Sequence, residues 1–316
     1  MALLRSIEEL AKIDGPVVLA AGVFDGVHRG HQALLAQALS DADRQGGTAI
    51  ALTFEPHPIK ILRPDKAPRL LSSLSQKEAL LRGFGMEDLL VLHFDAALAR
   101  MSAGHFLDQL LKATPHLCEI CVGSEWSFGH NREGNIDFLR AYGEREGFRV
   151  VSIPSVCVEG FPVSSTRIRK ALEKGDLKTA EDCLGHPYEI WGSIQHGAGL
   201  GAKLGFPTAN FGVKEIQLPP DGVYAVEAYK VRQKENILKG VANIGVRPTV
   251  STKGERLLEV HFLDTQGDFY GEEFAVRFVG FMRKEQRFDG VEALKTQIAE
   301  DIKMRREMKT GEQKRF

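Results

Sequence analysis

The feature that most constrains this chain is the stretch Gly22-Val23-Phe24-Asp25-Gly26-Val27-His28-Arg29-Gly30-His31. It follows the apolar run Val17 to Ala21, which is typical of a buried strand, and it precedes apolar residues that recur at helical spacing. Strand, glycine turn and helix therefore follow one another. Such a turn directs backbone N–H groups and the positive end of the helix at one place, which favours the binding of a phosphate.

Two histidines, His28 and His31, lie near the predicted start of this helix. Both imidazoles can face the same bound anion and stabilise charge that develops on it. An isolated histidine at a helix start is more often a capping or surface residue. A pair spaced His-x-Gly-His after a glycine-rich strand end favours the functional interpretation.

Length, composition and charge limit the kind of protein that this chain can be and the partners it can have. The chain has 316 residues, 43% hydrophobic and 26% charged, which is typical of a globular protein with room for two domains. Its 41 Lys and Arg against 42 Asp and Glu predict neither nucleic acid nor membrane as a partner. Met1 to Asp14 form a short amphipathic segment without the apolar core of a signal peptide, which predicts a cytoplasmic location. The basic stretch Lys303 to Arg315 is interpreted as a solvated helix end.

Four cysteines are too few for a disulfide scaffold. Cys118 and Cys121 form a C-x-x-C pair in a strand-like run, where positions three apart point to opposite faces. We therefore expect free buried thiols rather than a metal or redox site.

From Val17 to about Gly185, strand-like and helix-like segments alternate, which predicts a doubly wound parallel sheet of the α/β class. One helix start is marked by Ser75-Gln76-Lys77-Glu78, which has the form of a capping box. The predicted strands are Val17 to Ala21, Ala49 to Phe54, Leu89 to Phe94, Leu117 to Val122 and Phe148 to Ile153.

Ligands of such sheets bind beyond the carboxyl ends of the strands. Three segments follow predicted strands and are expected to line one crevice: Thr53 to Pro58, Gly123 to Gly129 and Ser164 to Arg169. The last begins a helix with hydroxyl groups and places Arg169 one turn in, which suits nucleotide phosphates. Ser-Ser-Thr is also a common helix cap, so both interpretations stay open for it.

Beyond Pro187 the pattern changes to turn-bounded strands, with no helical pattern until about Val291. This pattern predicts a small antiparallel β-barrel with a terminal helix. We place the domain boundary so that the first domain spans 1–185 and the second 186–316.

The glycine-rich segment Gly197 to Asn210 superficially matches a dinucleotide fingerprint, but Pro207 follows and no helical pattern opens. Two interpretations of this segment stay open: a flap that covers phosphates, and a flexible surface loop. Thr208 and Asn210 stand two apart, so in an extended chain both face one side, and their oxygens suit Mg²⁺ that is shared with phosphates. Glu259 lies in an otherwise apolar strand, where an isolated glutamate usually faces solvent.

These motifs, in this order from about Val17 to Ala299, resemble those of the bacterial bifunctional riboflavin kinase/FMN adenylyltransferases, also called FAD synthetases. Gly22 to His31 is similar to the signature of their Rossmann-like nucleotidyltransferase half, and Ser164 to Arg169 to their ATP-phosphate motif. Gly205 to Asn210 resembles the Mg–ATP motif of their riboflavin kinase module. The glutamate of the family's Glu-x-His strand, here Glu259, acts as the base on riboflavin.

The resemblance implies a set of site residues. Catalytic roles fall to Glu259, His28 and His31, and metal binding falls to Thr208 and Asn210. For the adenylyltransferase nucleotide the residues are Gly22, Phe24, Asp25, His28, His31, Ser165, Thr166 and Arg169. For the kinase nucleotide they are Gly199, Lys203, Gly205, Thr208 and Asn210, and for flavin they are Glu125, Phe128, Arg132, Glu259 and Arg283.

The implied activity is phosphorylation of riboflavin to FMN, followed by adenylylation of FMN to FAD, with ATP and Mg²⁺. Small molecules are then the partners, and transient self-association stays open. The chain departs from the family at Glu125-Trp126, where the family has Asp or Asn followed by Phe. That departure keeps one alternative open, a riboflavin kinase with an altered or inactive N-terminal domain. A non-catalytic flavin or nucleotide sensor is a further alternative, from a different class of protein. The sensor is disfavoured because it needs no base and metal ligands together.

Overall fold

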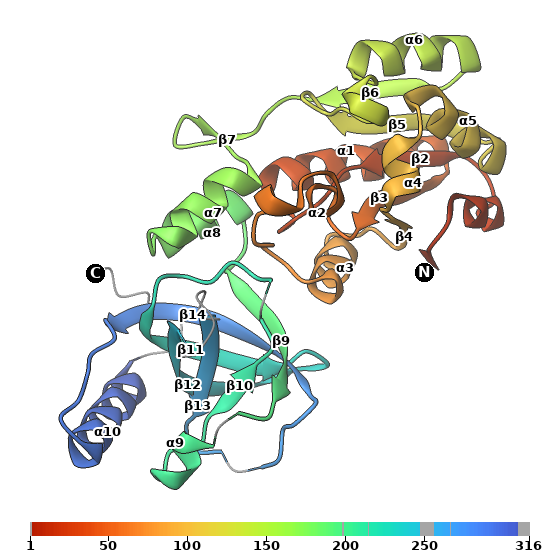
Figure 1. The fold of residues 1–316 in the computed structure, drawn as a ribbon. Coiled ribbons are helices and arrows are strands. Elements are labelled where there is room, and N and C mark those ends of the chain that lie inside the picture. The colour runs from red at the N-terminus through yellow and green to blue at the C-terminus, as the bar shows by residue number, and fades with distance from the viewer. Residues whose placement is uncertain (1, 198, 214, 247–255, 266, 309–316) are drawn as a thin grey trace. The chain divides into compact units, whose positions relative to one another are not determined.

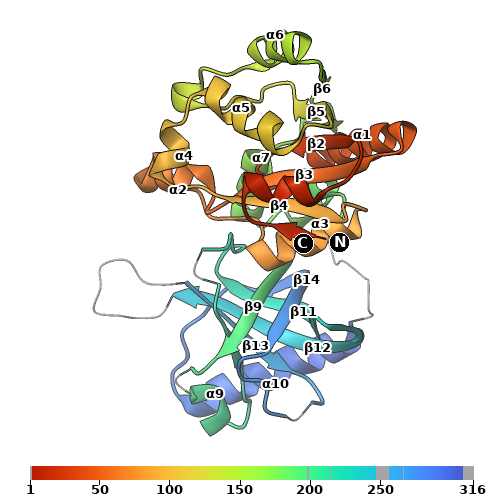
Figure 2. The ribbon, with the colours of Figure 1, turned by 90° about the vertical axis from the view of Figure 1, so that its right-hand side faces the viewer.

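The computed structural model describes residues 2–197, 199–213, 215–246, 256–265 and 267–308. The chain divides into two compact units (Figures 1 and 2). The first unit comprises Met1–Pro68 and Leu74–Ser165, and the second comprises Arg69–Ser73 and Thr166–Phe316. Each unit is described here by itself.

The first unit is built on a six-stranded parallel sheet of order β1-β4-β3-β2-β5-β6. The predicted doubly wound sheet is confirmed. Its strands are β1 (Leu3–Leu4), β2 (Val17–Ala21), β3 (Thr48–Glu55), β4 (Asp88–His93), β5 (Leu117–Gly123) and β6 (Arg149–Ile153).

Helices cover both faces of this sheet. Val17 and Leu19 of β2 pack into one core with η1, α5 and α6, while Val18 and Ala20 pack into another with α1 and α3. Burial on both faces is why β2 is an uninterrupted apolar run. The helices are η1 (Ile7–Lys12), α1 (Arg29–Gln45), α2 (Pro58–Leu62), η2 (Pro64–Lys66), α3 (Leu74–Gly83), α4 (Ala96–Arg100), α5 (Ala103–Ala113), η3 (His130–Arg132) and α6 (Ile136–Glu146). A hairpin of β7 (Cys157–Val158) and β8 (Phe161–Pro162) follows β6.

One local expectation is extended and another is wrong. The segment before Asp14 is amphipathic in η1, where Ile7 and Leu10 are buried, and Leu3 and Leu4 also pair with β4 as an added edge strand that is too short to show periodicity. Helix α3 begins at Leu74, so Ser75 lies inside its first turn and is not the residue before the helix.

The strand order places a topological switch at the centre of the sheet. From β2 the chain continues to β3 on one side, whereas β5 returns to pair with β2 on the other side. The carboxyl ends of such diverging strands form the binding crevice of open α/β sheets. The Gly22–His28 turn after β2 therefore lies where a ligand is expected.

The second unit is a closed barrel of order β10-β13-β12-β11-β14-β9, with antiparallel pairing around the ring. The predicted barrel and terminal helix are confirmed. Its strands are β9 (Glu189–Gln195), β10 (Ala209–Phe211), β11 (Gly222–Lys230), β12 (Gln233–Val246), β13 (Arg256–Phe262) and β14 (Glu273–Arg283). Its helices are α7 (Ser165–Glu173, whose first residue belongs to the first unit), α8 (Leu177–Leu184), α9 (Leu200–Lys203) and α10 (Val291–Glu307).

The glycine-rich segment before β10 was expected to hold no helix, but α9 forms one short turn there. A stretch of four residues is too short to produce a helical pattern in the sequence. At the other end of the unit, α10 is fixed by Arg305, whose fully buried guanidinium donates from Nε and Nη2 to the carbonyl of Val226 at 3.2 and 3.1 Å. Residues 309–316, which include part of the basic stretch, lie outside the described residues.

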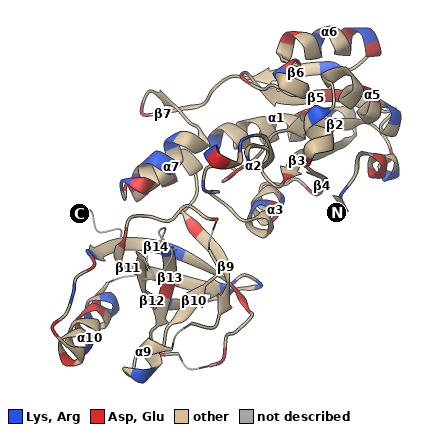
Figure 3. Ribbon diagram, viewed as in Figure 1, with Lys and Arg blue, Asp and Glu red and all other residues tan. Residues whose placement is uncertain are grey.

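Charges of both signs are interspersed along α6 and α10 (Figure 3), as expected from the balanced composition. None of the four cysteines, all among the described residues, forms a disulfide; Cys121 and Cys183 are buried, Cys118 is half-buried and Cys157 is exposed. The expectation of free buried thiols concerned Cys118 and Cys121: neither forms a disulfide, and burial is complete for Cys121 and partial for Cys118. Burial raises the pKa of the Cys121 thiol far above its usual range, so this thiol is unreactive.

A buried cluster lies between α1, β5 and β6. Asp41, Glu119 and Cys121 place their donor atoms within 4.8 Å of one another. Arg149 hydrogen-bonds to Glu119 and lies 3.4 Å from Asp41, which is also paired with Arg44. Since guanidinium groups already neutralise these carboxylates, we interpret the cluster as a structural ion network rather than a metal site.

Replacing Arg149 with methionine is expected to destabilise the first unit. The change leaves two fully buried carboxylates with less compensating charge. We expect a loss of about 2 kcal/mol in the free energy of unfolding, below the value for a fully buried pair because the Arg149 side chain itself stays partly solvated. Denaturant unfolding of the variant measures this loss, and Arg140→Met on the exposed surface of α6 is the control.

Candidate active sites

The first candidate site is the turn that joins β2 to α1. His28 is the N-cap of α1, and its Nδ1 accepts a hydrogen bond from the backbone N–H of His31 at 3.3 Å. The two imidazoles stack with their centroids 3.6 Å apart and 13° between their planes. The capping role and the paired arrangement are therefore both present, and the structure brings the two predicted histidines together.

Packing around these rings explains two glycines of the motif. A Cβ on Gly22 would lie 3.0 Å from the Phe24 ring, and one on Gly30 would lie 3.2 Å from the His28 ring. Phe24 is fully buried and packs edge-on against His31 at 5.2 Å. The buried Phe24 ring therefore supports the imidazole of His31, and it is not accessible to a ligand.

The same turn stores backbone strain. Phe24 has φ +54° and Val27 has φ +40°, a region that a β-branched residue rarely adopts. Such strain persists only where surrounding contacts hold it, and it concentrates at functional sites.

Burial lowers the pKa of His31 well below its usual value, and the nearby His28 and Lys77 lower it further. Its Nδ1 is buried with no hydrogen-bond partner among the described residues. The uncharged ring can satisfy this environment by carrying its proton on Nε2, which is then the atom available to donate to a ligand.

The other predicted residues for this nucleotide are divided between the two units. Asp25 is buried, and its carbonyl accepts a hydrogen bond from the Ser165 hydroxyl at 3.2 Å, which ties the start of α7 to the turn. Thr166 and Arg169 follow on α7 in the second unit, where Arg169 donates from Nε to the carbonyl of Arg69 at 2.6 Å.

The second candidate site is a cavity of about 600 Å³ that lies after β5 in the first unit. Glu125 and Arg132 both line it, and Arg132 donates from Nε to the Ser127 hydroxyl at 2.7 Å. Trp126 stacks on Phe128 at 4.5 Å, and Phe128 itself lies below the cavity among the core aromatics. The structure thus gathers two of the predicted flavin residues of this unit in one cavity, while Phe128 supports its wall.

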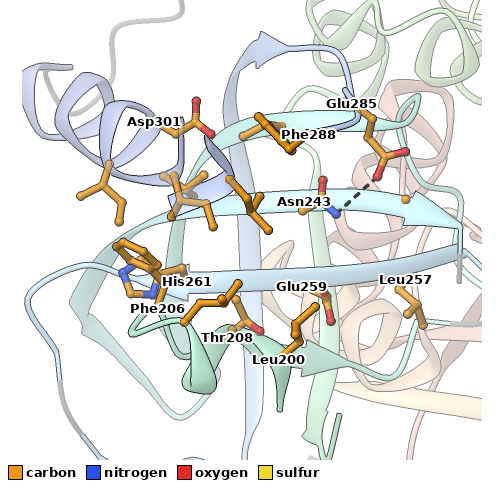
Figure 4. A pocket seen from close by; sticks show the side chains of 18 of the residues that line it. Leu200, Phe206, Thr208, Asn243, Leu257, Glu259, His261, Glu285, Phe288 and Asp301 are labelled. Atoms are coloured by element: carbon orange, nitrogen blue, oxygen red, sulfur yellow. Dashed lines mark hydrogen bonds between the residues drawn. The ribbon is translucent and has the colours of Figure 1, made fainter. Parts of the chain in front are cut away.

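The third candidate site is a cavity of about 620 Å³ on the outside of the barrel (Figure 4). One wall is the outward face of β12 and β13, and the others come from α9, α10 and the chain after β14. Along β13, Leu258, Val260 and Phe262 are buried, whereas Glu259 and His261 line the cavity. This alternation answers the question left open for Glu259, which faces a cavity rather than open solvent.

Polar groups cross three adjacent strands at the level of Glu259. Asn210 of β10 and Asn243 of β12 are each directly opposite Glu259 in the strand register. Directly opposed residues place their side chains on the same face of a sheet. Thr208, Asn243 and Glu259 line the cavity together (Figure 4).

Two glycines leave room for the predicted metal ligands. A Cβ on Gly197 would lie 2.1 Å from the Asn210 amide nitrogen; one on Gly201 would lie 2.5 Å from the Phe206 carbonyl and 3.1 Å from the Thr208 hydroxyl. A hydroxyl and a carboxamide oxygen are hard, neutral donors that suit Mg²⁺ bound jointly with phosphates. The residues present therefore fit such an ion.

Only some of the remaining predicted residues of the second unit line the cavity. Gly199 lines the cavity, whereas Lys203 and Gly205 flank it in the same segment. Arg283 lines the cavity with its guanidinium paired to Asp301 of α10 at 2.7 Å, so it joins β14 to the terminal helix.

Sequence reasoning missed Asp301 as part of this cavity, and it did not single out Asn243 or Glu285 as site residues although the segments that contain them resemble the kinase module. The amide of Asn243 donates to Glu285 at 3.5 Å and so links β12 to the chain after β14. Only the strand register could have revealed this link. Residues 247–249 of the segment that follows Asn243 lie outside the described residues.

Replacing Gly197 with alanine is expected to lower kinase activity at least tenfold, because the new Cβ displaces the Asn210 amide. The clash involves the end of a flexible side chain, so the unfolding midpoint should change little. Rates of FMN formation at increasing Mg²⁺ measure the effect, and partial recovery at high Mg²⁺ is the expected pattern. Gly104→Ala, where a Cβ meets nothing within 4 Å, is the control.

Comparisons with known proteins address both units. A family model described as FAD synthetase matches residues 10–167, and one described as riboflavin kinase matches residues 184–309. A bifunctional riboflavin kinase/FMN adenylyltransferase of Pseudomonas fluorescens is 40% identical over 96% of this chain and 96% of its own length. The protein of the same description from Escherichia coli is 39% identical over 95% of this chain and 96% of its own.

A crystal structure described as a macrolide-efflux protein from Streptococcus pneumoniae has the same fold, with a TM-score of 0.81. It is 29% identical and is matched over 98% of this chain and 99% of its own. The word efflux belongs to the description of the Streptococcus pneumoniae protein and assigns no activity to this chain. Among the described residues of the present chain, every helix is too short or too polar to cross a membrane.

A doubly wound domain with a dihistidine turn, joined in one chain to a barrel whose cavity is lined by Thr208 and Glu259, defines a two-module class of nucleotide-dependent transferase. The matches to both family models and to whole-length relatives identify the chain further. It belongs to the family of bifunctional riboflavin kinase/FMN adenylyltransferases.

Proposed function

We propose that this enzyme phosphorylates riboflavin to FMN in its C-terminal module and adenylylates FMN to FAD in its N-terminal module, with ATP as the co-substrate of both. The observation that carries the proposal is the presence in one chain of the stacked His28–His31 pair and of Glu259 in the barrel cavity. Each lies in a part of the chain that matches the corresponding family model.

In the kinase reaction, Glu259 accepts the proton of the riboflavin 5′-hydroxyl as its oxygen attacks the γ-phosphorus of ATP. The bond from that phosphorus to the β–γ bridging oxygen breaks, and ADP leaves. Thr208 and Asn210 hold Mg²⁺, which supplies electrostatic stabilisation of the phosphate oxygens when bound. Gly199, Lys203 and Gly205 belong to the flap that covers the nucleotide, and Arg283 positions the flavin side of the cavity through Asp301.

In the adenylyltransferase reaction, the phosphate of FMN attacks the α-phosphorus of ATP and pyrophosphate leaves. The attacking oxygen is already anionic, so no side-chain nucleophile is needed. His28 and His31 donate to the α-phosphate oxygens, with Gly22, Phe24 and Asp25 shaping their turn. Ser165, Thr166 and Arg169 bind the departing phosphates, and Glu125, Phe128 and Arg132 form or support the flavin pocket.

We place the functional boundary after Gly185, the left-handed C-cap of α8, so that residues 1–185 are the adenylyltransferase and 186–316 the kinase. We further propose a cytoplasmic enzyme whose partners are its small-molecule substrates, without nucleic acid or membrane; transient self-association stays open. The net charge of −1 supports the absence of nucleic acid and membrane as partners.

Among the alternatives, a kinase with an inactive first domain is disfavoured because both histidines are present and stacked. Glu125 also still lines the same cavity as Arg132 despite the Glu125-Trp126 departure. A sensor is disfavoured by the alignment of Glu259 with Asn210.

Chromatography of flavins after incubation of the protein with riboflavin, ATP and Mg²⁺, and separately with FMN, tests the proposal. We expect FMN and then FAD in the first mixture, and FAD directly in the second. FMN alone in the first mixture with no product in the second would leave a riboflavin kinase only. No ATP consumption in either mixture would leave a sensor.

A further inference from the structure

We propose that Lys77 is a positioning residue of the adenylyltransferase site, whose ammonium group fixes the dihistidine turn. The inference rests on the proposed adenylyltransferase function. Lys77 lies in α3 and is only 5% exposed, which is unusual for a lysine in the middle of an otherwise amphipathic helix.

Lys77 joins two of the segments that follow parallel strands. Its Nζ donates to the carbonyl of Val23, in the turn after β2, and to the carbonyl of Phe54, at the end of β3, both at 3.3 Å. The Val23 carbonyl also accepts from the Thr53 hydroxyl at 2.9 Å. Two side chains thus fix the peptide that links Val23 to Phe24.

This peptide is where the turn needs support. Phe24 follows it with a positive φ, and the Phe24 ring packs against His31. A rotation of the Val23 carbonyl would therefore move the ring on which His31 rests. By holding that carbonyl, Lys77 helps to sustain the strained conformation that brings the two imidazoles together.

The charge of Lys77 acts on the same site. The groups that bear on His31 are His28 and Lys77, and both lower its pKa in addition to burial. The groups that bear on Lys77 are the carboxylates Glu55, Asp25 and Glu78 and the like charge of Lys60. Burial lowers the pKa of Lys77, but these carboxylates oppose that shift and favour the ammonium form.

The charge of Lys77 should also affect the pH dependence of FAD formation. A histidine whose pKa is depressed stays neutral above that pKa and becomes charged as the pH falls through it. Removing the Lys77 charge raises the pKa of His31, so the neutral ring is lost at a higher pH. The acid limb of the adenylyltransferase profile should then move to higher pH.

The test compares Lys77→Met, which keeps most of the stem without the charge, with Lys77→Arg, which keeps the charge. FAD formation from FMN and ATP is measured against pH, and the imidazole resonance of His31 is titrated by NMR, assigned by its loss in His31→Gln. We expect Lys77→Met to lower kcat at least tenfold with a smaller change in the KM for ATP, and to move both the acid limb and the His31 titration upward. Lys77→Arg should leave the His31 titration near that of the unmodified enzyme.

Two controls keep the outcomes distinct. Lys112→Met on the exposed surface of α5 should match the unmodified enzyme in every measurement, and FMN formation should be unchanged in all variants. If the unmodified enzyme makes no FAD, the proposed function fails, whereas the NMR titration still tests Lys77. A folded Lys77→Met enzyme with an unmoved His31 titration, or with FAD formation within twofold of the unmodified enzyme, would overturn the inference.

Discussion

FMN formation is expected to fall by about two orders of magnitude or more when Glu259 is replaced with glutamine, because general-base catalysis contributes an effect of that size. Glutamine has nearly the same shape, so the outward face of β13 and the cavity that it lines should persist. The carboxylate that accepts the hydroxyl proton is lost, while the groups opposite it, Asn210 and Asn243, remain. The loss should therefore appear in kcat, with the KM for ATP close to its original value.

The measurement is the rate of FMN appearance from riboflavin, resolved by chromatography. Glu235→Gln, an exposed change on β12 outside the cavity, is the matched control and should have no effect. FAD formation from added FMN should be preserved in both variants, which shows that the polypeptide is folded and active. A Glu259→Gln enzyme that makes FMN at its original rate would remove Glu259 from the role of base.

The predictions that succeeded from sequence were those in which one residue pattern serves one structural need. The run Val17 to Ala21 predicted a central strand because burial on both faces requires apolar side chains throughout. Gly185, at the domain boundary placed from the sequence, is the left-handed C-cap of α8, a position that favours glycine, and its φ is +76°.

Predictions were limited where a residue serves two needs or where contacts are distant in sequence. His28 could be read as a cap or as a functional residue, and in the structure its Nδ1 caps α1 while its ring stacks on His31. Lys77 stood in the sequence as an unremarkable position of a capping box. Its burial depends on two carbonyls 54 and 23 positions away, which no local pattern reveals.

The same limit explains the glycines of the first motif. In the sequence, Gly22 and Gly30 belong to a glycine turn that favours the binding of a phosphate. The structure shows that a side chain at either position would first meet the ring of Phe24 or of His28. These glycines are therefore required by the packing that orients the histidines, whatever is bound there.

The double role of His28 makes the second prediction specific. Replacing His28 with alanine should lower FAD formation by about 10²–10³-fold, the usual effect of removing one donor to a developing anion. It should also cost about 1 kcal/mol of stability, because the cap of α1 is lost. Asparagine is a good N-cap residue but has no imidazole, so His28→Asn should lose the activity and keep the stability.

FAD formation from FMN and ATP and the denaturant midpoint of unfolding separate the two roles. FMN formation serves as the internal reference, and it should stay unchanged because Glu259 and its neighbours lie in the other unit. If His28→Asn retains most of the FAD activity, capping is the whole contribution of His28, and the stacked ring is a consequence of the helix start. If both variants lose FAD formation and only alanine loses stability, the imidazole acts on the nucleotide, and the cap is what holds it in place.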